Sequence, residues 1–322
     1  MKKLILIISI ILAATFFYFS ILWVWSATIK KWKYIVEKWA TVASLPKAFN
    51  LQISPTYLKL YLRLSWTKSD IKAWSFTIND DMTFQEFLIK KASKPDWLDR
   101  EITILPWWNI FDIDEMLAYK SVIKPGELIT LSKNISPALT SKYPFLKWHS
   151  LEGFIYPDTY RVALDAKLED ILKVTLDEFV KKIYTSNKWS DFYDNLIMSS
   201  IVEKEERDPL NKPIVAWILL KRLKENIAIW ADATVCYQYE ITSSNCTSQF
   251  IWEKIYIKSK YNTRERAWLP PTPISNMSAD TFDAVANPKS SQYYYYLHDL
   301  KWNIHYASSL KEHNNNKFKY LR

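Results

Sequence analysis

The chain has 322 residues, of which 49% are hydrophobic and 24% are charged, a globular composition with room for two or three small domains. Its formal charge of +9 suits an anionic partner, but the lysines are scattered and no basic helix stands out. This argues against a nucleic-acid partner and fits a polyanionic cell envelope. The four histidines lack metal-like spacing, so we expect no metal site and no cofactor.

The first predicted element is a membrane anchor. Residues 4–25, LILIISIILAATFFYFSILWVW, carry no charge and are long enough to span a bilayer as one helix. A cleaved signal peptide would have a shorter apolar run and a small-residue cleavage site, so the pattern predicts an uncleaved single-pass anchor. Lysines flank the span on both sides, so their charges do not assign its orientation.

Two copies of a strand, turn and helix plan are predicted after the anchor. Residues 40–65 first indicate an amphipathic helix, a turn and a second helix. Residues 75–93 then predict a strand and a helix whose N-cap is Thr83, with Glu86 three residues later. Residues 100–120 repeat that plan about thirty residues on, as small binding modules or spacers do.

Glycine and tryptophan are used abnormally. Glycine occurs twice and tryptophan sixteen times, whereas average usage predicts roughly 22 glycines at this length. Several tryptophans stand where a chain needs the positive φ that glycine tolerates, namely Trp74, Trp230, Trp268 and Trp302. We hypothesise that most of them come from UGA codons that the organism reads as glycine. The alternative is an aromatic-rich surface that binds sugars.

The stretch SSIVEKEERDP, residues 199–209, holds the candidate catalytic carboxyl. At 100° per residue, Glu205 falls in the middle of an apolar helical face, Glu203 lies nearly opposite, and Glu206 borders the face. A charge run at a helix end is usually solvated, which is the alternative interpretation. A carboxyl on an apolar face would instead have a raised pKa, as a general acid working near neutral pH requires.

Polar residues downstream predict a groove, and two cysteines leave a disulfide open. The groove candidates are Asp232, Thr234, Tyr261, Asn262, Thr263, Asn276 and His305. Cys236 and Cys246 lie ten residues apart, close enough to close a small loop, and a bridge there would require an oxidising compartment. Two unpaired thiols are an equal alternative, because spacing alone does not establish the Cα approach.

Seven stretches follow the anchor in a specific order: LEGFIYPDTY, SSIVEKE, VAWILLKRL, ADATVCY, YNT, LPPTPISN and NIHYASSLKEHN. In this order they resemble the endolytic murein transglycosylase family, also called YceG-like or MltG. The likeness covers nearly the whole chain. The family has glycine where Trp217, Trp230, Trp268 and Trp302 stand, which supports the recoding hypothesis.

The resemblance implies an α+β protein with one transmembrane helix, a small LysM-like module and an α+β catalytic domain. The implied boundaries are a cytoplasmic stub and anchor at 1–25, a linker and start of the membrane-proximal region at 26–55, the LysM-like module at 56–133, the catalytic domain at 134–312 and a C-terminal tail at 313–322.

The resemblance also implies an activity. Such enzymes cut the β-1,4 bond between N-acetylmuramic acid and N-acetylglucosamine in peptidoglycan without water, leave 1,6-anhydro ends, and terminate or trim nascent strands. One carboxyl serves in turn as acid and base, and the family's EKE motif assigns that role to Glu205. The same match implies supporting or sugar-binding roles for Glu203, Arg222, Asp232, Thr234, Tyr261, Asn262, Thr263, Asn276 and His305.

Four positions depart from the family pattern. Lys221 replaces an Asn, Ala233 replaces a Pro, and Arg264 replaces a Tyr. Glu206 stands where Thr or Ser usually follows the catalytic Glu. A second carboxylate close to Glu205 would raise the pKa of Glu205 further, which suits an acid but slows the base step.

The resemblance predicts a protein of the plasma membrane with its catalytic domain outside the cytoplasm, glycan strands as substrate and peptidoglycan synthases as candidate partners. Two other classes stay open. One is a peptidoglycan-binding scaffold with a degenerate site. The other is a hydrolase that uses water, which needs a second carboxylate facing Glu205 at about 5–9.5 Å, and the sequence offers Asp232 and Glu152.

Overall fold

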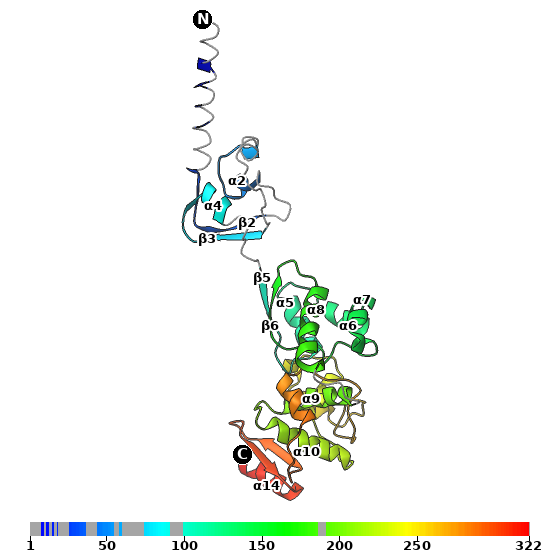
Figure 1. Ribbon diagram of the computed structural model, residues 1–322. Helices are drawn as coiled ribbons and strands as arrows, with labels where there is room; N and C mark the ends of the chain where they lie inside the picture. The colour runs from blue at the N-terminus through cyan, green and yellow to red at the C-terminus, as the bar shows by residue number, and fades with distance from the viewer. Residues whose placement is uncertain are drawn as a thin grey trace. The chain divides into compact units, whose positions relative to one another are not determined.

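The computed structural model describes residues 8, 9, 11, 12, 15, 18, 26–36, 44–54, 58, 59, 74–90, 99–185 and 191–321. It has mixed helices and strands, as the predicted α+β class requires, and forms two compact units, Met1–Arg100 and Glu101–Arg322 (Figure 1). Among the described residues no helix is long and apolar enough to cross a membrane, and most of the predicted anchor lies outside them. The predicted module boundaries, including that of the LysM-like module, stay predictions.

The first unit contains two small antiparallel sheets and the helices α2 and α4. Its strands β1 and β4 pair with each other, as do β2 and β3. The side chains of Phe76, Phe84 and Phe87 are fully buried in its core. The bounds are β1 Thr28–Ile29, β2 Trp32–Val36, α2 Leu45–Ala48, β3 Trp74–Ile78, β4 Met82–Thr83 and α4 Phe84–Lys90.

The predicted cap of the helix after residue 83 is confirmed. The backbone N–H of Thr83 donates to Glu86 Oε2 at 3.0 Å, and the N–H of Glu86 donates to Thr83 Oγ1 at 3.2 Å. This reciprocal pair satisfies donors that the first turn of a helix leaves free. Of the helices predicted over residues 40–65, the described residues include the short α2 and two helical residues, Leu58 and Lys59, of the second.

The second unit is mainly helical, with two further two-stranded sheets, β5–β6 and β7–β8. Its elements are β5 Asp99–Thr103, which begins at the end of the first unit, α5 Ile110–Tyr119, α6 Glu127–Lys133, α7 Pro137–Lys142, β6 Thr159–Ala163, α8 Leu168–Phe179, α9 Phe192–Glu205, α10 Lys212–Lys224, α11 Asp232–Tyr237, α12 Ser248–Lys254, α13 Ala279–Ala286, β7 Tyr295–His298, β8 Ile304–Ala307 and α14 Leu310–Tyr320. The second strand–turn–helix copy, β5 and α5, is present as predicted.

Helix α9 lies in the interior of the second unit, packed against α10 and α13 (Figure 1). Every residue from Leu196 to Glu203 is buried, so the predicted polar side of this helix does not face solvent. Ser200 explains why a polar side can be buried. Its hydroxyl donates to Ile197 O at 2.7 Å and accepts from Ile274 N at 3.0 Å, which joins the helix to the LPPTPISN stretch.

The LPPTPISN stretch also requires a glycine opposite it. Gly153 has φ of 84°, and a Cβ atom at this position would come within 2.7 Å of Pro273. A side chain here would be strained by its backbone conformation and by this contact. Gly153 therefore allows LEGFIYPDTY to pack directly on LPPTPISN.

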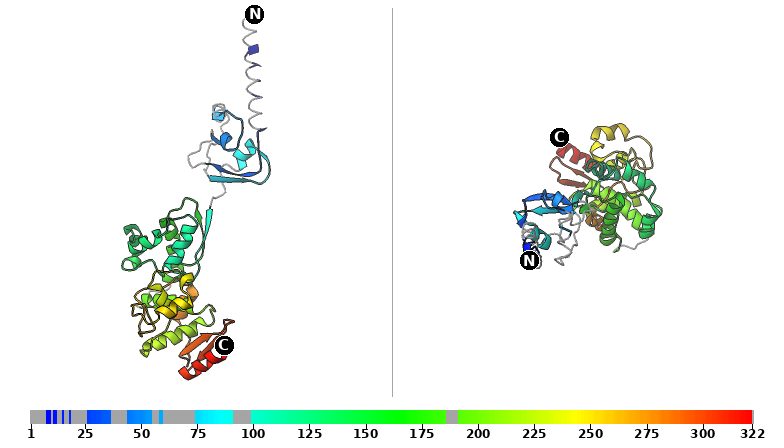
Figure 2. Two further views of the ribbon diagram at one scale, coloured as in Figure 1. Left: turned by 180° about the vertical axis from the view of Figure 1, so that it is seen from behind. Right: turned by 90° about the horizontal axis from the view of Figure 1, so that it is seen from above.

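A hairpin of β7 and β8 ends the unit, with α14 packed on it (Figure 2). Its antiparallel register pairs Tyr296 with Tyr306 and Leu297 with His305. Trp302 lies in its turn with φ of 63°, and Trp230 has φ of 59°, so two of the four tryptophans expected to need positive φ have it. Trp74 and Trp268 do not, whereas Trp107, which the sequence analysis did not single out, has φ of 57°.

Candidate active site

Glu205 is the last residue of α9, and its carboxyl lies beside the β7–β8 hairpin. The hydroxyl of Tyr296 donates to Glu205 Oε2 at 2.9 Å. Burial raises the pKa of Glu205 to about 7, the Tyr296 hydrogen bond counteracts it, and the charge of Asp232 raises it further. A carboxyl in this state can hold a proton near neutral pH and also release it.

Glu206 begins the non-helical chain after α9, with extended backbone angles of −138° and 131°. Its Oε1 accepts from the N–H groups of Arg207 and Asp208 at 2.7 and 2.8 Å, and its Oε2 lies 3.1 Å from His298 Nε2. Burial works to raise the pKa of Glu206, but these hydrogen bonds leave it lowered. The carboxylate that raises the pKa of Glu205 is Asp232, rather than the expected Glu206.

Glu203 ties α9 to two neighbouring elements and is not a solvated helix-end charge. Lys212 Nζ lies 3.0 Å from its Oε1, and both side chains are only 5% exposed. Ser278 N donates to Oε2 at 3.0 Å, and the hydroxyl of Thr281 donates to the same oxygen. Removing one partner of a buried ion pair typically destabilises the fold by several kcal/mol. The contacts of Glu203 therefore serve the structure.

Asp232 opens α11 and forms an ion pair with Arg264. Behind it, the hydroxyls of Thr234 and Thr263 lie 2.9 Å apart, and Thr263 Oγ1 accepts from Ala231 N at 3.1 Å. Both threonines are buried. These contacts join two of the predicted motifs, ADATVCY and YNT, and place Asp232 where its charge acts on Glu205.

Tyr261, Asn262 and Asn276 hold loops together. The Tyr261 hydroxyl lies 3.0 Å from Thr272 Oγ1, and the Asn262 amide donates to two carbonyls of the preceding loop at 2.8 and 2.9 Å. Asn276 Oδ1 accepts from Ile155 N at 3.0 Å. These contacts give each residue a role in the structure. Their sugar-binding roles stay predictions.

Arg222 and His305 also have contacts of their own. Arg222 is buried, donates to the carbonyls of Tyr294 and Ala228, and lies 4.6 Å from the ring centroid of Trp230. His305 Nε2 lies 3.1 Å from Asp299 Oδ2, and its ring stacks on Tyr320 at 3.6 Å. The histidine near Glu205 is His298, which bonds to the adjacent Glu206 and was not among the predicted site residues.

Tyr296 and His298 are two functional candidates that were not predicted from the sequence. They are two residues apart on β7, so their side chains share one face of the strand. In a stretch with four consecutive tyrosines the sequence carries no sign of which hydroxyl faces α9. Strand alternation groups residues 296 and 298 on one face, but it does not say whether this face meets α9.

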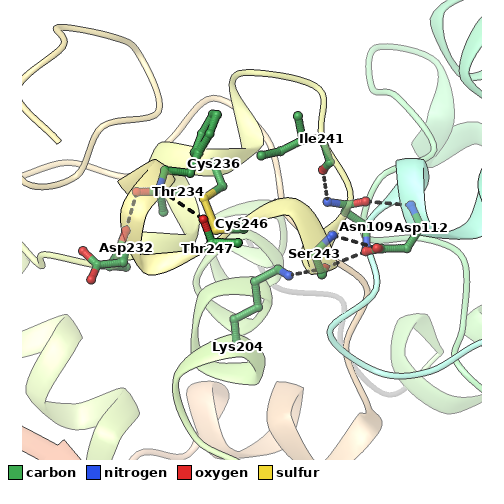
Figure 3. The surroundings of a disulfide bond; sticks show 12 residues. Asn109, Asp112, Lys204, Asp232, Thr234, Cys236, Ile241, Ser243, Cys246 and Thr247 are labelled. Carbon is green, nitrogen blue, oxygen red and sulfur yellow. Dashed lines mark hydrogen bonds between the residues drawn. A yellow bond between two sulfur atoms is a disulfide. The ribbon is translucent and has the colours of Figure 1, made fainter. Parts of the chain in front are cut away.

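Cys236 and Cys246 form a disulfide with a Cα separation of 5.6 Å (Figure 3). The loop that it closes contacts α9 and α5. Within the loop, the Ser243 hydroxyl accepts from Lys204 Nζ at 2.9 Å and donates to Asp112 Oδ2 at 2.6 Å. The disulfide loop therefore holds the residue directly before Glu205.

Glu152, offered as a second carboxylate, is 1% exposed. Its Oε2 accepts from Ile110 N at 2.9 Å at the start of α5, and burial raises its pKa to about 7. The charged groups acting on it are Lys204 and Asp112, and it is not among the groups that shift Glu205. Asp232 is the carboxylate whose charge reaches Glu205.

Residues 37–319 match the model of the YceG-like family. A Bacillus subtilis (strain 168) protein named endolytic murein transglycosylase is 30% identical over 180 residues, which is 54% of this chain and 49% of that protein. A Streptococcus pneumoniae (strain D39) protein of the same name is 22% identical over 175 residues, 52% of this chain and 32% of that one. The chain thus spans half or less of the length of these curated relatives.

The fold also has a solved counterpart. The crystal structure of a YceG-like protein from Listeria monocytogenes aligns with a TM-score of 0.58 at 22% identity. The alignment covers 89% of this chain and 99% of that one. At this identity the likeness concerns the fold alone.

Proposed function

We propose, because this chain belongs to the YceG-like family, that it is an endolytic lytic transglycosylase acting on the glycan strands of peptidoglycan. It would cleave the β-1,4 bond after N-acetylmuramic acid and leave 1,6-anhydro ends, and so terminate or trim nascent strands. The relatives' name supports the substrate class. The observation that carries the proposal is the Glu205 carboxyl, whose pKa burial raises to about 7.

The proposed reaction needs one carboxyl with two duties. Protonated Glu205 gives its proton to the glycosidic oxygen as the bond from that oxygen to C1 of N-acetylmuramic acid breaks. The resulting carboxylate then takes the proton of the sugar's own 6-hydroxyl as O6 bonds to C1. Glu205 ends protonated again and no water is consumed, so a pKa near 7 serves both steps.

A hydrolase is the second candidate, and Asp232 is the observation that favours it. Its charge acts on Glu205, and its carboxylate is partly exposed beside Arg264. A hydrolase of two carboxylates would add water at C1 and release reducing ends. In a transglycosylase the same Asp232–Arg264 pair would orient the sugar beside Glu205.

A digest of purified glycan strands by the full chain in detergent, with product ends identified by mass, tests the proposal. The same digest is run with Glu205→Gln and with Glu253→Gln, an identical change at an exposed carboxylate of α12. We expect anhydro ends from the parent and from Glu253→Gln. Glu205→Gln should lower the rate at least 100-fold, because it cannot transfer the proton.

The other outcomes assign the other functions. Reducing ends in place of anhydro ends would identify a hydrolase. Strand binding without cleavage by the parent and by Glu253→Gln would leave a peptidoglycan-binding scaffold as the function.

We also propose that residues 4–25 anchor the protein in the plasma membrane and that the chain after residue 25 lies outside the cytoplasm, near peptidoglycan synthases. The Cys236–Cys246 disulfide supports this location, since such bonds persist in oxidising compartments. A protease added to spheroplasts should degrade the catalytic unit. Complete protection in intact spheroplasts, with digestion after lysis, would place that unit in the cytoplasm instead.

A further inference from the structure

The Glu205 carboxyl has two unequal oxygens. Its Oε2 accepts the Tyr296 hydroxyl at 2.9 Å. Its Oε1 accepts no hydrogen bond from any residue that the structure describes, and the side chain is only partly buried. One oxygen is therefore held by the protein, and the other is left for a bound molecule.

Tyr296 reaches Glu205 because side chains alternate between the two faces of a β-strand. Tyr296 and His298 point to the same face of β7, while Leu297 between them is buried. They meet Glu205 and Glu206 in turn, at 2.9 and 3.1 Å. Successive carboxyls can meet alternate strand residues because α9 ends at Glu205 and the chain continues extended.

Tyr296 remains a hydrogen-bond donor at any pH at which the enzyme could work. Burial and the neighbouring charge of Glu205 raise the pKa of Tyr296 well above its ordinary value of 10. Its hydroxyl therefore stays protonated and stabilises the carboxylate form of Glu205. It acts together with His298 and Arg264, which favour that form, and against burial and Asp232, which oppose it.

We propose that Tyr296 is a positioning residue for the reaction at Glu205: its hydroxyl fixes Oε2 and leaves Oε1 as the atom that gives and takes the proton. This inference rests on the proposed function. It also assigns the C-terminal hairpin a part in the active site, because the donor belongs to β7. Tyr296 acts through Glu205 and is not itself expected to touch the reacting bond.

Tyr296→Phe tests the proposal, with Tyr294→Phe as the matched control. Both changes remove one tyrosine hydroxyl near the start of the hairpin, but the Tyr294 hydroxyl donates to the exposed Glu225 at 3.0 Å. The full chain in detergent is labelled with carboxyl-¹³C glutamate, and Glu205→Gln identifies the signal of Glu205. The titration of that signal and the pH dependence of strand cleavage are then measured.

We expect Tyr296→Phe to raise the pKa of Glu205 by about one pH unit, since a donor to the charged form is lost. The alkaline limb of kcat/KM, which reports the protonated acid, should move upward by the same amount. We expect kcat to fall roughly tenfold with KM unchanged, because a carboxyl that is no longer fixed is less well aligned. Tyr294→Phe should leave all three quantities at the parent's values.

A parent-like titration or a parent-like pH limb in folded Tyr296→Phe would overturn the proposal. If the parent itself cleaves no strands, the proposed function fails, and the NMR titration alone still decides whether Tyr296 acts on Glu205. If Tyr296→Phe does not fold, 3-fluorotyrosine is incorporated at position 296. Its more acidic hydroxyl should lower the pKa of Glu205, and an unchanged titration would again reject the proposal.

Discussion

Glu205 and Glu206 are adjacent in the chain but differ in charge state because their surroundings differ. Burial dominates at Glu205 and raises its pKa to about 7. At Glu206 the His298 ring and two backbone N–H groups outweigh burial and lower the pKa. At neutral pH, Glu205 can exchange its proton while Glu206 stays ionised and holds its loop.

The apolar periodicity of residues 197–202 made Glu205 the best placed of the three carboxyls, and the order of the motifs then assigned its role. The partners of the neighbouring carboxyls were not predictable in this way. Glu203 lies on the polar side of α9. This side is nonetheless buried, because Lys212 and Thr281 from other helices bond to the Glu203 carboxyl. Such pairings depend on tertiary packing, which helical periodicity alone does not contain.

Tryptophan at positive φ leads to a prediction about stability. Trp230 and Trp302 occupy left-handed backbone and are 39% and 54% exposed, so they bear a steric cost and bury little surface. Glycine at either position should raise the free energy of unfolding by about 0.5–1 kcal/mol, measured by urea denaturation. The loss of the cation–π contacts that Trp230 makes with the buried Arg222 and Trp302 makes with Arg207 offsets part of the gain.

Trp252 is the matched control, since it is 72% exposed inside α12, where glycine is unfavourable. Trp252→Gly should therefore lower the free energy of unfolding by about 0.5 kcal/mol. Equal losses at Trp230, Trp302 and Trp252 would contradict the steric argument. The mass of the protein from its natural source decides the recoding hypothesis itself: tryptophan at Trp230 would reject it, and glycine there would support it.

At the scale of elements, the short loop closed by the disulfide connects α11 with α9 and α5. Asp232 begins α11, Cys236 lies in the same helix, and Ser243 in the loop accepts a hydrogen bond from Lys204 (Figure 3). Replacing both cysteines by serine should lower the free energy of unfolding by about 2–3 kcal/mol, because the bridge closes a loop of separation 10. Chemical denaturation of both proteins measures this difference.

Reductant provides the control for that prediction. The parent should lose the same stability when reduced, and the double serine variant should not respond to reductant. A variant as stable as the oxidised parent would show that the bridge adds nothing to folding. A variant that still responds to reductant would show that the reductant acts elsewhere.

Local and non-local elements differed in how well they could be predicted. The capping box of Thr83 and Glu86 spans three residues and was read directly from the sequence. The contact of β7 with the end of α9 joins residues 91 positions apart. A one-residue change of strand register would reverse which side chains face α9, and the sequence alone does not set that register.

At the scale of the whole molecule, the order of motifs identified the family, and the match over residues 37–319 confirms it. The α+β class is likewise confirmed. The division at Arg100 and Glu101 was not predicted, because the two strand–turn–helix copies looked alike in sequence. Packing separates them: β3 and α4 belong to the first unit, and α5 belongs to the second.

The hydrogen bond from Tyr296 to Glu205 also has a consequence for the synthesis of the protein on the ribosome. Glu205 leaves the ribosome 91 residues before its partner, a delay on the order of 5–20 s at ordinary rates of synthesis. Until the hairpin has emerged, the growing chain carries its carboxyl without the hydroxyl that fixes it. On the proposed role of Tyr296, the last hairpin to be translated completes the site, and a chain that ends before it would hold Glu205 without its hydrogen-bond donor.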